Sequence, residues 1–375
     1  MQTKNLFYLI LCFCCMLHSS LNAQIYLGFL DLSSLTVSSE AADVAMGESY
    51  TAYPYGISAF THNPATLMGT SGANLFYFYR DNEAIDFLDQ SQYNTYGASI
   101  STSLGNFGVS YQKFSLGRIT VTTITNQAGY SQVEFIDETL DLAFSRNFTD
   151  QLTLGLGAKW YDGQINNLSG TPLDMSTHGA IIFDIGALYW IPGFVATREV
   201  SDHFFFGASF QNFGTDFDYR LEDVPDYTAV QLPRFFRLGF TYRLHAQDPG
   251  SGFSFKYFLT GEYRRLLNPS DAYNKANCDF GGIGFKAMFF DIFSLEIGGY
   301  YNSVPSFTTD EDRFNIRYGF NVDLALKQFG ADYPVTVTFQ FAHIPVSNYL
   351  EPLFSEGSKN LPVFSIRLAY TDSIF

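Results

Sequence analysis

Histidines are the residues of this sequence whose chemistry would allow acid–base catalysis. Beyond residue 23 they are His62, His178, His203, His245 and His343. His178 follows Ser176 and Thr177 in a predicted loop, which makes it the best candidate for a serine–histidine pair. Such a pair needs a third group that orients the imidazole, and the sequence singles out none. We therefore predict no catalytic residue; the alternative, a hydrolase, requires His178 to reach a serine and an acid or amide.

The sequence also lacks the motifs of metal and cofactor sites. Cys278 is the single cysteine beyond residue 23, which excludes an intrachain disulfide and a cysteine metal site in the exported chain. No HExxH, EF-hand or phosphate-loop pattern occurs. The run Gly281-Gly282-Ile283-Gly284 lies inside a predicted strand, where glycine allows a bend or bulge. We therefore predict no metal ion and no cofactor.

The first 23 residues have the order of a secretory signal. Lys4 gives a basic start, the apolar run 6–17 follows, and small and polar residues lead to Ala23. The apolar run is too short to span a bilayer as a helix. We predict a signal peptide at 1–23 with cleavage after Ala23. The cysteines within the run leave a lipoprotein signal as the alternative.

The composition favours a membrane β-barrel over other exported proteins. Aromatic residues make up 18% of the chain, whereas charged residues make up only 15%. The formal net charge is −16 and no basic patch occurs, so we predict no nucleic-acid partner. No helix-length apolar run follows residue 23. A soluble β-sandwich is the alternative.

From Asn74 onward, apolar and polar residues alternate with the period of a strand. In the clearest segment, Phe314, Ile316, Tyr318, Phe320, Val322, Leu324 and Leu326 share one face, and Asn315, Arg317, Gly319, Asn321, Asp323 and Lys327 share the other. A face of Phe and Leu suits contact with outer-membrane lipid, and a charged face suits a wet lumen. About fourteen such segments occur, most of about nine to twelve residues, which is enough to cross a membrane at barrel tilt. The predicted strands begin near Asn74, Tyr93, Asn106, Thr139, Gln151, Gly179, His203, Phe235, Phe253, Asp279, Ile292, Phe314, Pro334 and Val363.

The connections between these segments alternate between short and long. The predicted long loops are 81–92, 116–138, 163–178, 215–234, 266–278, 302–313 and 345–362. The predicted short links include 104–105, 148–150, 290–291 and the longer stretch 192–202. Short turns at one end and long loops at the other are typical of outer-membrane barrels, and a sandwich gives no reason for the alternation. We predict an all-β, integral outer-membrane barrel of about 14 antiparallel strands with both termini on the periplasmic side.

The segment before the first strand differs from the rest. The stretch 46–67 carries one charge, Glu48, and is rich in small residues. A helix is predicted at 38–46, with Ser38 or Ser39 as its cap and Gly47 at its end, and a turn is predicted at Asn63. We predict a partly helical hatch at 24–72 inside a barrel of residues 73–375. The candidate hatch and lumen residues are Met46, Gly47, Tyr53, Tyr55, Asn63, Pro64 and Ala65.

Several charges lie at lumen-facing positions of the predicted strands, namely Lys159, Glu296, Arg317, Asp323 and Arg367. They would either line a polar path or neutralise one another inside a plugged barrel. The sequence favours neither reading over the other.

Motifs in the first two thirds of the chain carry a resemblance to a known family. They are Ala42, Ala45-Met46-Gly47, Ser58-Ala59, Asn63-Pro64-Ala65-Thr66-Leu67, Asp184-Ile185-Gly186-Ala187-Leu188-Tyr189, Phe206-Gly207-Ala208, Gln211-Asn212-Phe213-Gly214, Leu232-Pro233 and Arg237-Leu238-Gly239. In order and spacing, from about Ala41 to Tyr242, they resemble the PorV/PorQ family, which is similar to the FadL fatty-acid transporters. The chain departs from that family at Tyr53-Pro54-Tyr55-Gly56, where acidic residues are usual, and at Thr66, where many members have glycine.

The resemblance implies a 14-stranded outer-membrane barrel with an N-terminal hatch. It further implies a role in the type IX secretion of Bacteroidota, in which the partners would be secretion components or the C-terminal signal domains of cargo. The alternative is a FadL-like transporter of hydrophobic small molecules. That alternative needs an apolar pocket beside the hatch and a lateral or axial exit.

Overall fold

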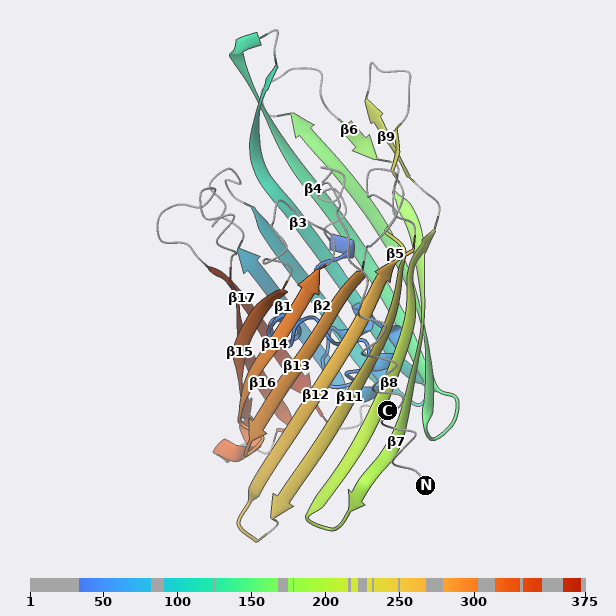
Figure 1. Cartoon of the computed structure of the whole chain (residues 1–375), viewed down its shortest axis with the longest axis vertical. Helices are drawn as coiled ribbons and strands as arrows, with labels where there is room; N and C mark the ends of the chain where they lie inside the picture. The colour runs from blue at the N-terminus through green and yellow to red at the C-terminus, as the bar shows by residue number, and fades with distance from the viewer. Residues whose placement is uncertain are drawn as a thin grey trace.

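The chain forms a closed antiparallel barrel of 14 strands in a computed structural model (Figure 1). The structure describes residues 34–81, 91–123, 126–167, 175–177, 179–214, 217–221, 228–230, 233–248, 250–267, 279–302, 314–330, 333–345 and 360–371. The predicted signal peptide, Cys278, His178 and most of the predicted long-loop residues lie outside these ranges. Within the described residues, no helix is long and apolar enough to cross a membrane.

The barrel strands follow one another around the wall in chain order. They are β1 (Ala73–Asp81), β2 (Gln92–Thr102), β3 (Gly105–Thr123), β4 (Asn126–Asn147), β5 (Leu152–Asn167), β7 (Ala180–Ala196), β8 (Val200–Gly214), β11 (Phe235–Asp248), β12 (Phe253–Leu266), β13 (Asp279–Phe289), β14 (Phe293–Asn302), β15 (Phe314–Ala325), β16 (Val335–Pro345) and β17 (Asn360–Tyr370). Pairing of β1 with β17, from Ala73 opposite Tyr370 to Arg80 opposite Val363, closes the barrel. Closure leaves no open edge, which hydrocarbon would not tolerate. The predicted fold class is confirmed.

Side chains alternate across the wall as the sequence predicts. On β15, Phe314, Ile316 and Tyr318 are exposed on the outer surface, whereas Arg317 is buried in the lumen. The other strands repeat this arrangement, with exposed Leu, Ile and Phe on the outside. An outer band of apolar side chains around a polar interior is what lipid requires of a spanning barrel.

The ends of the barrel differ. Short turns join β2 to β3, β4 to β5, β7 to β8, β11 to β12 and β13 to β14 at one end, the lower end in Figure 1. The start of β1 and the end of β17 lie at this same end, since Ala73 pairs with Tyr370 and with Ile100, which is two residues from the end of β2 at the β2–β3 turn. Short turns face the periplasm in outer-membrane barrels, so we call this the periplasmic end and the other the outer end.

Several predicted connections are wrong because the strands are longer than expected. The predicted loop 116–138 is largely strand: β3 continues to Thr123 and β4 starts at Asn126, with Ile119 opposite Val133. This stretch is rich in Thr and Val, which favour strands, but its alternation is weak. The predicted link 192–202 is also mostly strand, because β7 runs to Ala196 and β8 begins at Val200. Short strands β6 (Met175–Thr177), β9 (Phe217–Leu221) and β10 (Thr228–Val230) occupy parts of other predicted loops.

Residues 34–72, the N-terminal segment, lie inside the barrel. The segment contains α2 (Ala41–Ala45) and two 3-10 helices, η2 (Ala59–Thr61) and η3 (Pro64–Gly69). The predicted helix 38–46 is thus shorter, and its N-cap is Glu40 rather than Ser38 or Ser39. The predicted turn at Asn63 is the start of η3, where the Asn63 side chain accepts a hydrogen bond from the Ala65 N–H.

Glycines of the wall allow the backbone of the N-terminal segment to approach it closely. Gly47 itself has φ +69°, which ends α2 in a left-handed turn that favours glycine. A Cβ atom on Gly282 of β13 would collide with the Gly47 carbonyl oxygen, and one on Gly284 would collide with that of Met46. Gly186 of β7 faces the Asn63 side chain in the same way. The glycine run of β13 therefore provides close approach, and the register of β13 with β12 and β14 contains no bulge.

Replacing Gly282 by alanine should loosen the N-terminal segment. The added methyl group would force the Gly47 backbone away from the wall, and overpacking of this kind costs about 1–3 kcal/mol. The matched control is Gly281→Ala in the same strand, because a Cβ there would lie 3.8 Å from its nearest neighbour, an ordinary contact. We expect a lower melting temperature and faster proteolysis of the segment in Gly282→Ala only. Equal behaviour of the two variants would contradict the close-packing account.

Candidate functional site

The predicted hatch residues are almost completely buried inside the barrel. Met46, Asn63 and Ala65 have exposed fractions of 0%, and Tyr53 has 3%. Gly47 and Pro64 are also buried, and Tyr55 is half-buried. The structure therefore brings all of these candidates together at the interface between the N-terminal segment and the wall.

Asn63 joins the N-terminal segment to itself and to the wall. Its side-chain amide donates to the carbonyl oxygens of Thr51, at 2.7 Å, and Ala187 of β7, at 3.0 Å. Its Oδ1 accepts from the Ala65 N–H at 3.1 Å, so both the amide nitrogen and the amide oxygen of the side chain form hydrogen bonds. Satisfying buried polar groups in this way fixes the position of the segment against the wall.

A chain of buried polar groups crosses from the segment to strands β11 and β12. Asp43 Oδ2 accepts from Ser38 Oγ at 2.5 Å and from His62 Nε2 at 3.2 Å. His62 Nδ1 lies 3.3 Å from an Arg237 guanidinium nitrogen, which also donates to Glu262 at 2.8 Å. Burial, and then the charge of Arg237, lower the pKa of His62 well below its ordinary value. His62 is therefore a neutral imidazole whose two nitrogens both have structural partners.

Glu48 forms the second polar connection between the segment and the wall. Its carboxylate lies 2.6 Å from Arg317 of β15 and 3.6 Å from Arg264 of β12. Burial alone would raise the pKa of Glu48, but the Arg317 and then the Arg264 guanidinium groups hold it below its ordinary value. The single charge of the stretch 46–67 is thus matched by two cations of the wall.

Other charges of the lumen are paired within the wall. Lys159 lies 2.6 Å from Asp184, and Lys286 lies 2.9 Å from Glu296. Asp184 also accepts from the backbone N–H of Asn212, whose φ of 61° marks a β-bulge between β7 and β8. Among the predicted lumen charges, Asp323 accepts from Thr338 and Arg367 donates to Asn74. Of the predicted lumen charges, Lys159, Glu296 and Arg317 contact opposite charges, as the neutralisation reading expects, whereas Asp323 and Arg367 form these hydrogen bonds with neutral side chains.

Aromatic side chains surround the part of the segment that departs from the family pattern. Tyr53 stacks on Tyr50, with ring centroids 4.5 Å apart, and meets Phe258 of β12 edge-on at 5.5 Å. Tyr55 packs against Phe205 of β8 at 5.9 Å, and its hydroxyl oxygen accepts a hydrogen bond from the Arg243 guanidinium group. Phe205 and Phe258 were not predicted as site residues, because a lumen-facing Phe in a strand has no sequence signal that separates it from a lipid-facing one.

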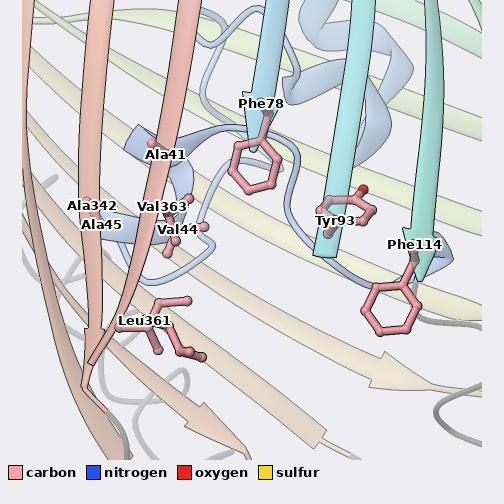
Figure 2. Packing of buried hydrophobic residues seen from close by; sticks show 10 residues of the cluster. Ala41, Val44, Ala45, Phe78, Tyr93, Phe114, Ala342, Leu361 and Val363 are labelled. Carbon is pink, nitrogen blue, oxygen red and sulfur yellow. The ribbon is translucent and has the colours of Figure 1, made fainter. Parts of the chain in front are cut away.

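Apolar side chains also line the lumen wall towards its outer end. Figure 2 shows Phe78, Tyr93 and Phe114 on adjacent strands β1, β2 and β3, near the helix that carries Val44. Ala342, Ile344, Leu361 and Val363 of β16 and β17 complete this strand surface, which we call the apolar wall, and Ala41, Val44 and Ala45 of α2 pack against it. The side chains of Phe235, Leu266 and Phe280 form a second apolar group on β11, β12 and β13.

The cavity between the first described residues of the N-terminal segment and the wall is small. A polar cavity of about 10 Å3 lies between the residues 34–37, His62, Gln112, Thr139 and Arg237. Such a volume holds about one water molecule. A larger solute does not fit in this cavity while the segment is in place.

The histidines do not form the hydrolase site considered above within the described residues. His178 lies outside them. His203 Nδ1 lies 3.0 Å from Arg243, and His245 Nε2 lies 3.5 Å from Ser254 Oγ. Groups of His, Cys, Asp and Glu able to hold a metal ion are also absent from this part of the chain.

The fold resembles solved hydrocarbon channels. The TodX deltaS2S3 mutant monoaromatic hydrocarbon channel shares 12% identity, with a TM-score of 0.50 over 89% of this chain and 99% of that chain. The Pseudomonas putida toluene transporter TodX shares 11% identity, with a TM-score of 0.46 over 89% and 98%. The Ralstonia pickettii toluene transporter TbuX shares 12%, with a TM-score of 0.44 over 88% and 97%. At such identities the likeness shows the fold, which implies an outer-membrane location.

The sequence matches no protein-family model and no curated protein sequence. The three structures named above are two toluene transporters and a monoaromatic hydrocarbon channel. The resemblance to PorV/PorQ therefore rests on the sequence motifs alone.

Replacing Glu48 by glutamine should weaken the attachment of the segment in a pH-dependent way. Its pKa is lowered in the folded protein, so its stabilising contribution is complete at neutral pH and is lost as acid protonates the carboxylate. Removing one charge from a buried pair costs about 3–5 kcal/mol. We expect Glu48→Gln to melt at a lower temperature than wild type at pH 7, with the difference narrowing in acid.

The control for this measurement is Glu138→Gln. Glu138 pairs with Lys113 at 3.1 Å, but both side chains are partly exposed. An exposed pair contributes at most about 1 kcal/mol. A pH-independent difference for Glu48→Gln, or an equal loss in both variants, would show that Glu48 does not fix the segment.

Proposed function

We propose that the protein moves hydrophobic small molecules across the outer membrane. The observation that carries this proposal is the apolar wall, which faces the lumen with Phe78, Tyr93 and Phe114. Barrel lumens that conduct water and ions are typically polar, whereas apolar solutes bind to apolar and aromatic surfaces. A row of buried aromatic side chains towards the outer end suits a solute of that class.

In this proposal the N-terminal segment is the gate. Val44 and Ala45 pack against the apolar wall and cover it. A solute can therefore bind to that surface only when the segment moves away from it. The ion pairs of Glu48 and the hydrogen bonds of Asn63 favour the closed arrangement. A solute shifts the equilibrium towards the open arrangement only as far as it binds that arrangement more tightly.

The structural neighbours support the same class of solute. Two of them are toluene transporters, and the third is a monoaromatic hydrocarbon channel. Their likeness to this chain extends to the fold, and toluene therefore serves here as a probe rather than as an assigned substrate.

A role in type IX protein secretion is the second candidate. It is supported by the ordered motifs that resemble the PorV/PorQ family, several of which, such as Met46, Gly47 and Asn63, lie where the segment meets the wall. In this role the barrel would bind secretion components or cargo signal domains at its outer end. The predicted division into a hatch at 24–72 and a barrel at 73–375 belongs to both proposals.

A reversible lock tests the gate. Ser49 Oγ of the segment and Thr260 Oγ1 of β12 lie 2.5 Å apart, which suits a disulfide after Ser49→Cys and Thr260→Cys in a Cys278→Ser background. We expect oxidation to reduce uptake of radiolabelled toluene by cells producing this variant to the level of cells without the barrel. A reductant should restore uptake, because it frees the segment.

The two single-cysteine variants are the controls for the lock. They should transport toluene equally under oxidising and reducing conditions, since they cannot form the bond. Full uptake through the oxidised double variant would contradict a gate formed by this segment. Absence of uptake through the reduced protein would contradict hydrocarbon transport.

The secretion role is tested in the native cell. If the protein serves type IX secretion, deleting its gene should retain cargo in the periplasm, and the tagged protein should recover secretion components. Normal export of cargo from the deletion strain would contradict this role while leaving hydrocarbon transport intact.

A further inference from the structure

The outer, lipid-facing surface carries a deep apolar concavity of about 930 Å3. It extends over β1, β2, β3, β4, β5, β7 and β8. Its rim is formed by exposed side chains that include Leu75, Phe107, Leu142, Leu156 and Phe183. Since these residues point away from the lumen, the concavity belongs to the surface that faces lipid and is separate from the candidate site.

Small residues at outward positions create this concavity. Ala98 of β2 lies opposite Val109 of β3, and Ala158 of β5 lies between Leu142 and Phe183. Large side chains therefore surround a floor of small ones. The β-bulge between β7 and β8 interrupts the wall on one side, where Phe183 pairs with Phe213. Bulges bend a strand and re-aim its side chains, which deepens the depression.

The concavity reaches the periplasmic end of the barrel wall on β2, β3 and β4. Phe107 and its partner Ile100, both in its lining, are within a few residues of the short turn between β2 and β3. Phe144 of β4 lies in the same row, because it pairs with Phe107. Short turns lie on the periplasmic side, so this part of the depression faces the inner leaflet of the outer membrane. From there the depression extends to Phe183 and Phe213, near the outer ends of β7 and β8.

A cation lies at the periplasmic margin of this depression. A second concavity of about 520 Å3 shares Phe144, Leu156 and Ile185 with the first and is also lined by Arg146. Arg146 is exposed and has the outward parity of Leu142 and Phe144 on β4. Within the described part of the chain, no ion-pair partner of Arg146 occurs.

An apolar depression that ends in an unpaired guanidinium group is complementary to one amphipathic molecule. We infer that the two concavities bind a phospholipid of the periplasmic leaflet, with its acyl chains in the larger concavity and its phosphate on Arg146. A guanidinium group forms two parallel hydrogen bonds to a phosphate and is not deprotonated at neutral pH. Attraction to a phosphate also explains an outward arginine on a chain whose formal net charge is −16.

Native mass spectrometry of the full-length mature protein tests this site. The protein is released from a non-ionic detergent with dioleoylphosphatidylglycerol added as the probe. We expect wild type to keep one lipid, and we expect Arg146→Gln to bind it about tenfold more weakly because a charge-assisted contact is lost. Ala158→Phe should weaken binding to a similar extent by filling the floor. Ala98→Phe provides a second filling variant should Ala158→Phe fold poorly, as judged by its melting temperature.

Matched controls come from other strands. Lys327→Gln removes an exposed cation at the periplasmic end near β15, and Ala287→Phe adds an aromatic ring at an outward position of β13. Both should bind the lipid as wild type does. Dioleoylglycerol, which has the same acyl chains but no phosphate, should bind wild type and Arg146→Gln equally weakly.

Three outcomes would overturn the inference. One is unchanged lipid binding by Arg146→Gln and Ala158→Phe. Another is equal weakening by the control variants, which would indicate a general lipid belt. The third is a protein dimer that Ala158→Phe dissociates while lipid has no effect, because a second copy would then occupy the depression.

Discussion

The architecture depends on the close approach of the N-terminal backbone to glycines of the barrel wall. Gly282, Gly284 and Gly186 leave room for main-chain atoms of Gly47 and Met46 and for the Asn63 side chain. Without side chains at these points, the segment packs directly on the strands, and the cavity beside residues 34–37 of the segment holds about one water molecule. A barrel of 14 strands would otherwise enclose a wide lumen.

Close packing also places charges of the lumen in contact with partners rather than with water. Glu48 meets Arg317, and Arg237 meets Glu262, with Thr51 of the segment donating to the same carboxylate at 3.0 Å. Removing the segment would take a polar partner away from each of these buried charges, which is energetically costly. The charges therefore favour a single closed position of the segment over a range of loosely bound positions. The polar contacts therefore fix the segment. In the proposed function, a hydrophobic solute competes with Val44 of the segment for binding to the apolar wall.

The sequence predicts the barrel well because strand alternation is a local property. The period-two pattern of β15 and the spacing of short turns required no knowledge of contacts. The lengths of β3 and β4 were underestimated, since their outer parts alternate weakly and extend by pairing with each other. Partners such as Lys159 and Asp184 lie on different strands. Their pairing depends on the register between the strands, so it could not be predicted from the sequence. The role of the β13 glycines was likewise hidden, because the segment that touches them is more than 200 residues away in the chain.

The central claim is that the N-terminal segment closes the lumen. The most direct test compares the single-channel conductance in planar lipid bilayers of the mature wild-type protein and of a variant that lacks residues 25–70. Because the strands supply their own closed hydrogen-bond ladder, the shortened chain should still insert as a barrel. The account predicts a closed wild-type barrel and stable, open conductance through the variant. Equal conductance of the two proteins would contradict it.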